Sequence, residues 1–178
     1  MNDILHAADT APDAPAKILV VMGVSGVGKT AVGRAVAERL GWAFQEGDAL
    51  HPEANIKKMA AGDPLADADR RPWLEAVAAW IDRQLTAKAC GVITCSALKR
   101  AYRDTIAGGR PEVRLVYLTA HENVIAARLA ARVGHFMPPG LLRSQLETLE
   151  EPAADEHPIV VDAALPVEAI VDTILGFL

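Results

Sequence analysis

The chain has 178 residues, a length typical of one domain. With 51% hydrophobic and 23% charged residues it has the composition of an ordinary globular protein, and its net charge of −5 argues against non-specific nucleic-acid binding. No apolar run approaches the roughly 18–20 residues that cross a bilayer, and the N-terminus lacks the basic and apolar regions of a signal peptide. Cys90 and Cys95 lack CxxC spacing. We therefore predict a cytoplasmic protein with two buried, reduced thiols and no membrane or nucleic-acid partner.

Apolar patterning along the chain predicts strands that alternate with helices. Residues 1–16 show no periodicity, so we expect a disordered tail there and a single domain over 17–178. Strands are predicted at 18–22, 42–46, 92–95, 113–118 and 159–162. Helices are predicted at 28–40, 53–61, 73–88, 121–132, 139–149 and 167–178. This alternation predicts an α/β fold with a five-stranded parallel sheet, helices on both faces, and ligands at the carboxyl ends of the strands.

A phosphate-binding loop follows the first predicted strand. The sequence Gly23-Val24-Ser25-Gly26-Val27-Gly28-Lys29-Thr30 fits G-x-x-x-x-G-K-[ST] at every fixed position. Glycines let successive backbone N–H groups point at phosphate oxygens, and the helix that follows adds its dipole to the same anion site. Lys29 is expected to reach the β- and γ-phosphates of ATP, and the Thr30 hydroxyl is expected to bind Mg²⁺.

Other features of the sequence narrow the class of nucleotide-binding protein. The guanine-reading pattern N-K-x-D is absent, which argues against a GTPase. The strand at 159–162 ends in Asp162, which is either a Walker B carboxylate or an ordinary acid at a strand end. The strand at 92–95 is followed by Ser96 rather than by an acid, so Mg²⁺ is expected to bind Thr30, phosphates and water, with possible help from Asp48. A small single domain suits a small-molecule kinase better than a motor.

The polar segment 47–72 is predicted to bind the phosphoryl acceptor. Asp48 comes directly after the second predicted strand, so it is expected at the carboxyl edge of the sheet, facing the transferred group. There it would orient or deprotonate an acceptor hydroxyl, unless it is simply a turn residue after Gly47. His51 lies in the same loop and is either a substrate ligand or a structural or solvated histidine.

Four segments together resemble the gluconokinase family of P-loop kinases. They are GVSGVGKT, GDALHPEANIKKMAAGDPLADADRRPWL, CSALKRAYRD and GHFMPPGLLRSQLETLEEP, and the resemblance covers about residues 17–178. It implies a three-layer, adenylate-kinase-like fold with a small helical lid, and it implies transfer of the ATP γ-phosphate to O6 of D-gluconate. It also implies a homodimer.

The acceptor segment and its neighbours carry several cations that suit a polyol with one carboxylate. Arg71 is a candidate for a bidentate clamp on that carboxylate. Lys99 follows the carboxyl end of a predicted strand, which is the edge of the sheet where ligands are expected. Any one of these cations alone is equally well explained as a solvated surface residue. The residues expected to bind substrate are Asp48, His51, Lys58, Arg71, Lys99 and Arg103, with Lys57 and Arg70 as further candidates.

A mobile lid is predicted over about residues 128–150. Arg128 and Arg132 are four residues apart and project from one face of the helix at 121–132. The glycine- and proline-bounded segment 134–140 follows them, as a lid hinge requires. The family resemblance implies that this pair closes over the ATP phosphates and stabilises charge on the transferring group, although an ordinary basic helix face would look the same.

The sequence thus predicts an ATP-dependent gluconate kinase with Lys29, Asp48, Arg128 and Arg132 as its catalytic residues. Two alternatives stay open. One is a P-loop kinase for another small acceptor, such as shikimate or a nucleoside monophosphate. The other is a nucleotide-binding module with no transfer activity.

Overall fold

The computed structural model describes residues 17–131 and 139–178. The predicted tail at 1–16 lies outside the described residues. Every predicted strand is present, with its ends shifted by at most one residue. The strands are β1 (Ile18–Met22), β2 (Ala43–Gln45), β3 (Gly91–Thr94), β4 (Val113–Thr119) and β5 (Ile159–Asp162).

The strands form one parallel sheet in the order β2-β3-β1-β4-β5. The central strand β1 pairs with β3 on one side and β4 on the other, and all five of its residues are buried. Its uninterrupted apolar sequence is explained by this position, because both faces of a central parallel strand are covered. The predicted α/β class with a five-stranded parallel sheet is confirmed.

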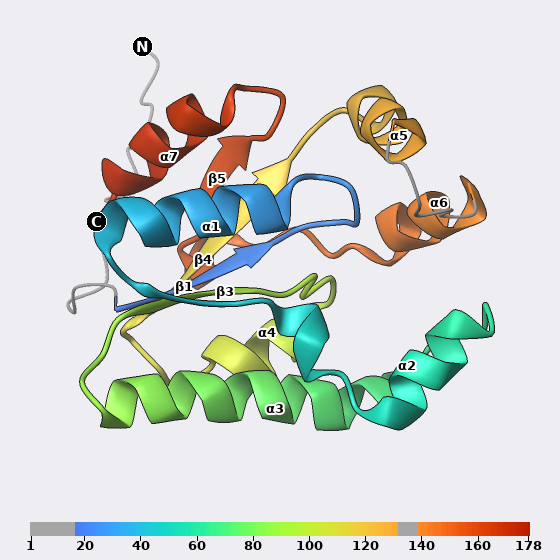
Figure 1. The fold of residues 1–178 in the computed structure, drawn as a ribbon, viewed down its shortest axis with the longest axis horizontal. Coiled ribbons are helices and arrows are strands. Elements are labelled where there is room, and N and C mark those ends of the chain that lie inside the picture. Colours follow the sequence, from blue (N-terminus) through green and yellow to red (C-terminus); the bar gives the residue numbers. More distant parts are fainter. Residues whose placement is uncertain (1–16, 132–138) are drawn as a thin grey trace, which may run out of the picture.

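Helices cover both faces of the sheet, as predicted (Figure 1). They are α1 (Lys29–Leu40), α2 (Glu53–Ala60), α3 (Asp67–Thr86), α4 (Arg100–Ala107), α5 (Glu122–Ala130), α6 (Pro139–Thr148) and α7 (Val167–Leu175). Helices α1 and α7 pack on one face, and α3 and α4 pack on the other. Helices α5 and α6 lie beyond the carboxyl edge and contribute Ile125 and Leu142 to the same apolar cluster as α1 and α7. Within the described ranges, no helix is long and apolar enough to span a membrane.

Two helices on the α3–α4 face differ from the sequence prediction. Helix α3 begins at Asp67 rather than at residue 73, because the Asp69 carboxylate accepts the backbone N–H of Ala66 at 2.7 Å and caps the helix ahead of Pro72. Helix α4 was not predicted at all. Its eight residues bury Tyr102 and Ile106, one turn apart, in the apolar cluster that α3 also lines.

Candidate active site

The predicted phosphate loop connects β1 to α1 at the carboxyl edge of the sheet. Gly23, Gly26 and Gly28 all have positive φ angles, of 137°, 84° and 112°. At Gly23 a side chain is also excluded by space, because a Cβ would lie 2.6 Å from the carbonyl oxygen of Leu118 in β4. The loop therefore needs glycine at these positions for its path alone.

The Lys29 side chain folds back across the phosphate loop. Its Nζ donates hydrogen bonds to the carbonyl oxygens of Gly23 at 3.0 Å and Val24 at 3.1 Å. Thr30 follows in the first turn of α1 and is partly exposed. The ammonium group is thus held over the loop by its carbonyls, next to the helix terminus that favours anions.

Helix α6 contacts the phosphate loop through Gln145, a residue that the sequence did not single out. The Ser25 backbone N–H donates to Gln145 Oε1 at 2.7 Å, and Gln145 Nε2 donates to Ser25 Oγ at 3.0 Å. The amide side chain thus both accepts from and donates to one residue of the loop. The signal for this contact is not local, because the two residues are 120 positions apart.

Helix α5 also packs on the phosphate loop. A Cβ at Gly26 would lie 2.6 Å from the Leu129 side chain. Arg128 donates to the carbonyl oxygens of Val27 at 3.0 Å and Ala163 at 2.6 Å, so its guanidinium ties the loop to the chain after β5. The structure therefore places Arg128 at the phosphate loop, as expected, but with backbone carbonyls as its partners. Its predicted companion Arg132 lies outside the described residues, as does most of the segment 134–140.

On the acceptor side, Asp48 lies at the carboxyl end of β2 in a short 3₁₀ helix, Gly47–Leu50 (η1). The backbone of Gly47 is fixed on both sides: its N–H donates to Thr94 Oγ1 at 3.0 Å, and its carbonyl accepts Trp73 Nε1 at 2.8 Å. The Thr94 hydroxyl in turn donates to the Glu46 carboxylate. A Cβ at Gly47 would lie 1.8 Å from the Thr94 carbonyl oxygen, so only glycine fits at this contact. The exposed Asp48 carboxylate is thus carried by a rigid turn.

The charges of Asp48 and Lys29 both act on the buried thiol of Cys95. This cysteine follows β3 and is 1% exposed, and burial raises the pKa of its thiol to about 12. The Asp48 charge also raises that pKa, whereas the Lys29 charge lowers it. Both charges therefore lie within electrostatic reach of one buried group, in agreement with the sheet, which places the acceptor loop after β2 and the phosphate loop after β1 at the same carboxyl edge. Cys90, in contrast, is only partly buried, and the prediction of two buried thiols is wrong for it.

His51 is held by an aromatic stack at the end of the acceptor loop. Its ring lies 4.2 Å from the ring of Trp73, with 14° between their planes. Asn55 Nδ2 lies 3.3 Å from His51 Nδ1 and also donates to the carbonyl oxygen of Asp69 at 2.8 Å. Burial lowers the pKa of His51, the charge of Asp48 raises it, and that of Arg70 lowers it, with a lower pKa as the net result. The histidine is therefore neutral at pH 7, and its ring is fixed between α2 and α3.

The remaining predicted substrate ligands differ in their surroundings. Lys58 forms an ion pair with Asp69 at 2.7 Å, which joins α2 to the start of α3. Lys99 forms an ion pair with Asp67 at 2.8 Å. Arg71 is exposed on α3, and its side chain has no ion pair or hydrogen bond within the described part of the chain. The structure thus brings Lys58 and Lys99 to acidic partners at the start of α3, and it leaves Arg71 in solvent.

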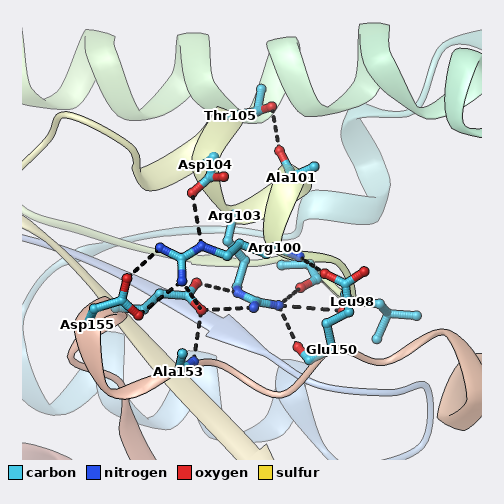
Figure 2. Close-up of polar contacts among 11 residues, drawn as sticks. Leu98, Arg100, Ala101, Arg103, Asp104, Thr105, Glu150, Ala153 and Asp155 are labelled. Atoms are coloured by element: carbon cyan, nitrogen blue, oxygen red, sulfur yellow. Dashed lines mark hydrogen bonds and ion pairs between the residues drawn. The ribbon is translucent and has the colours of Figure 1, made fainter.

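Arg103, a predicted substrate ligand, is buried in the protein and bonded to its own chain. Only 1% of its side chain is exposed, and its guanidinium pairs with the Glu156 carboxylate at 2.5 and 2.9 Å. It also donates to the carbonyl oxygen of Ala97 at 3.1 Å. A further bond runs to the carbonyl oxygen of Glu150 at 2.8 Å (Figure 2). Arg103 therefore clamps the loop after β3 to the chain that follows α6, and its donors are used within the protein.

Asp162, the candidate Walker B residue, stabilises a turn after β5. Its strand β5 lies at the edge of the sheet, separated from β1 by β4. The exposed carboxylate accepts the backbone N–H of Ala164 at 2.8 Å. This is the ordinary role of an acid at a strand end.

The chemistry of the donor groups in this site fits a magnesium ion that arrives with a nucleotide. The described residues contain no group of three or more His, Cys, Asp or Glu side chains that could hold a metal by themselves. Mg²⁺ in nucleotide sites is typically bound by one or two protein oxygens, substrate phosphates and water. The hydroxyl of Thr30, the residue that follows Lys29, would supply one such oxygen.

The sheet order, the phosphate loop at the end of β1 and the covering helices define a P-loop nucleotide-binding domain of the kinase class. Residues 18–152 match the AAA domain family. The chain is 48% identical over 159 residues to the gluconokinase of Gluconobacter oxydans strain 621H, a match that covers 89% of each chain. It is 50% identical over 156 residues to the thermoresistant gluconokinase of Escherichia coli strain K12, covering 86% of this chain and 89% of that one. The crystal structure of a gluconokinase from Sinorhizobium meliloti 1021 has a TM-score of 0.80 and 48% identity, covering 92% of this chain and 91% of that one. The chain belongs to the gluconokinase family.

Proposed function

We propose that this protein transfers the γ-phosphoryl group of ATP to O6 of D-gluconate, which yields ADP and 6-phospho-D-gluconate. The observation that carries the proposal is the match of nearly the whole chain to gluconokinases at close to half identity. The geometry supports it, because a phosphate loop and a rigid turn carrying a carboxylate meet at one edge of the sheet.

In this proposal, the phosphate loop holds ATP. The backbone N–H groups of residues 23–30 and the Lys29 ammonium bind the phosphates, and Thr30 supplies a ligand to Mg²⁺. Bound Mg²⁺ would neutralise charge on the phosphate oxygens. Arg128 supports the loop from outside through the Val27 carbonyl. For Arg128 to reach the phosphoryl group, its two bonds to backbone carbonyls would have to open.

Asp48 orients the acceptor hydroxyl in this proposal. As the bond between O6 and the γ-phosphorus forms, the bond from that phosphorus to the bridging oxygen of ADP breaks. The hydroxyl proton passes to the Asp48 carboxylate or through it to water. The transition state is loose, so positioning and charge contribute more to the rate than the strength of the base.

A direct assay tests this function. ADP formation with MgATP is measured with D-gluconate, shikimate, AMP or water as the acceptor, and Lys29→Ala serves as the control for contaminating kinases. We expect turnover with gluconate alone. Turnover with shikimate or AMP instead would point to another small-molecule kinase, and ATP binding without any acceptor-dependent ADP would point to a non-catalytic module.

Three further expectations stay predictions. A homodimer is expected from the family resemblance, and sedimentation velocity at micromolar concentration checks it. A cytoplasmic location is checked by cell fractionation. The division of the chain into a tail at 1–16 and one domain over 17–178 is checked by limited proteolysis, which should trim the tail and leave the domain whole.

A further inference from the structure

A cluster of two cations and one phenol surrounds the carboxylate of Asp67 at the start of α3. Lys99 Nζ donates to both oxygens of Asp67, at 3.0 and 2.8 Å, and the Tyr102 hydroxyl donates to Oδ1. Arg70 Nη1 lies 3.5 Å from the same oxygen and 3.5 Å from the Tyr102 hydroxyl. Lys99 and Arg70 also lie over the Tyr102 ring, 5.6 and 5.9 Å from its centre. Three donors from two helices and a loop therefore converge on one point.

The cluster has more positive charge than its own carboxylate balances. Lys99 and Arg70 both face the Asp67 carboxylate, because the nearby carboxylate of Asp69 is already paired with Lys58 at 2.7 Å. The Arg70 guanidinium reaches Asp67 with a single nitrogen at the limit of hydrogen-bond distance. Within the described residues, no carboxylate forms a two-pronged pair with Arg70, although that is the geometry that a guanidinium favours. These donors suit the carboxylate of a ligand that takes the place of Asp67.

Asp67 is the member of the cluster that can leave most easily. Its side chain is 60% exposed, compared with 31% for Lys99 and 30% for Arg70, whereas Tyr102 is buried. It also stands at the first position of α3, where its side chain borders solvent. A rotation of Asp67 into water would leave the donors in place and open their common point to a ligand.

The cluster lies on the acceptor side of the site. The Asn55 amide joins His51 to the chain next to Arg70: its Nδ2 lies 3.3 Å from His51 Nδ1 and donates at 2.8 Å to the carbonyl oxygen of Asp69. His51 stacks on Trp73, whose indole N–H holds the turn that carries Asp48. An acceptor with a hydroxyl at one end and a carboxylate at the other could therefore reach Asp48 and the cluster at once.

We propose that Arg70, Lys99 and Tyr102 form the subsite for the carboxylate of the acceptor, and that the carboxylate of Asp67 occupies this subsite when no acceptor is bound. The proposal rests on the proposed function, because it takes an aldonate as the acceptor. It assigns the carboxylate clamp to Arg70 rather than to its neighbour Arg71, and it makes Asp67 an internal competitor of the substrate.

The test measures KM for D-gluconate, KM for ATP and kcat in the wild type and in Arg70→Gln, Lys99→Gln and Asp67→Asn. Arg83→Gln, which changes an exposed arginine later on α3, is the matched control. Losing one charged hydrogen-bond donor should raise KM for gluconate about 10- to 100-fold in Arg70→Gln and Lys99→Gln, with KM for ATP unchanged. Asp67→Asn should lower KM for gluconate, because the competing charge is gone.

The opposite signs separate this subsite from a merely structural cluster. If Asp67→Asn raises KM for gluconate as Arg70→Gln does, the ion pairs of Asp67 only support the fold of the site, and the proposal is overturned. Provided that the wild type turns over gluconate normally, the proposal is also overturned if KM for gluconate is unchanged in Arg70→Gln and Lys99→Gln. It is likewise overturned if, among the arginine variants, only Arg71→Gln raises KM for gluconate. A wild type that releases no ADP with gluconate would instead show that the proposed function itself has failed.

Discussion

Replacement of Arg103 by methionine should destabilise the protein without acting on the substrate. The variant removes the buried ion pair with Glu156 and the bonds to the carbonyl oxygens of Ala97 and Glu150. Methionine fills part of the space but donates no hydrogen bond. Among the residues that the structure describes, the buried carboxylate of Glu156 then keeps the more distant Arg100, at 4.0 Å, and the N–H of Ala153 at 2.9 Å.

The size of the effect follows from burial. The side chains of Arg103 and Glu156 are 1% and 8% exposed, so the loss of one partner leaves an anion largely out of water. Breaking such a pair costs about 3–5 kcal/mol, out of a total stability of about 5–15 kcal/mol for a typical domain. For a chain of this length, that corresponds to a fall in Tm of about 6–20 °C.

Equilibrium unfolding in urea, followed by circular dichroism, measures this loss. Arg39→Met is the matched control, because Arg39 also pairs with two acids, Glu168 and Asp172, but its side chain is 53% exposed. A surface pair of this kind contributes about 0–1 kcal/mol. If Arg103→Met unfolds within about 1 kcal/mol of the wild type and instead raises KM for gluconate, the buried-clamp reasoning is wrong and Arg103 returns as a substrate ligand.

Three further predictions concern the site and acid stability. Lys29→Ala should lower kcat by about 10³-fold and Asp48→Asn by clearly less, because charge stabilisation outweighs base strength in phosphoryl transfer; steady-state assays compare the two, and equal losses would refute the ranking. Gly47→Ala should destabilise the protein by more than about 1 kcal/mol and lower activity, since its Cβ would lie 1.8 Å from the Thr94 carbonyl oxygen; a variant with wild-type Tm and kcat would contradict this. Burial acts to raise the pKa of Glu156, but its hydrogen bonds and the neighbouring arginines outweigh burial and hold that pKa below the ordinary value. Its stabilising contribution should therefore be full above about pH 4.3 and fade as pH falls further, and urea unfolding between pH 3 and 6 should show a steeper decline for the wild type than for Arg103→Met.

The sequence was informative where local chemistry decides the structure. The apolar run of β1, the glycines of the phosphate loop and Gly41 at the end of α1 each specify a conformation through their own residues, and each was placed correctly. Gly41 has a φ of 67°, the left-handed value that a helix-ending glycine adopts. Patterns of this kind need no knowledge of the partner segment.

The sequence was misleading where a distant partner decides the role. The polar segment 47–72 led to a predicted helix start at residue 73, but the cap at Asp69 starts α3 ahead of Pro72. Arg103 lies in a motif rich in polar residues, yet its partner Glu156 is 53 positions away and draws it into the interior. Gln145 was missed for the same reason, since nothing near it in the sequence indicates the contact with Ser25.

The buried thiol of Cys95 makes the junction of the two loops chemically observable. A thiol reacts with alkylating agents as the thiolate, and burial both hides this sulfur and keeps it protonated. Alkylation at Cys95 therefore requires the edge of the sheet between Lys29 and Asp48 to open, whereas Cys90 is partly accessible already. The rate of alkylation at Cys95, compared with the rate at Cys90, therefore reports how often the acceptor and phosphate loops separate.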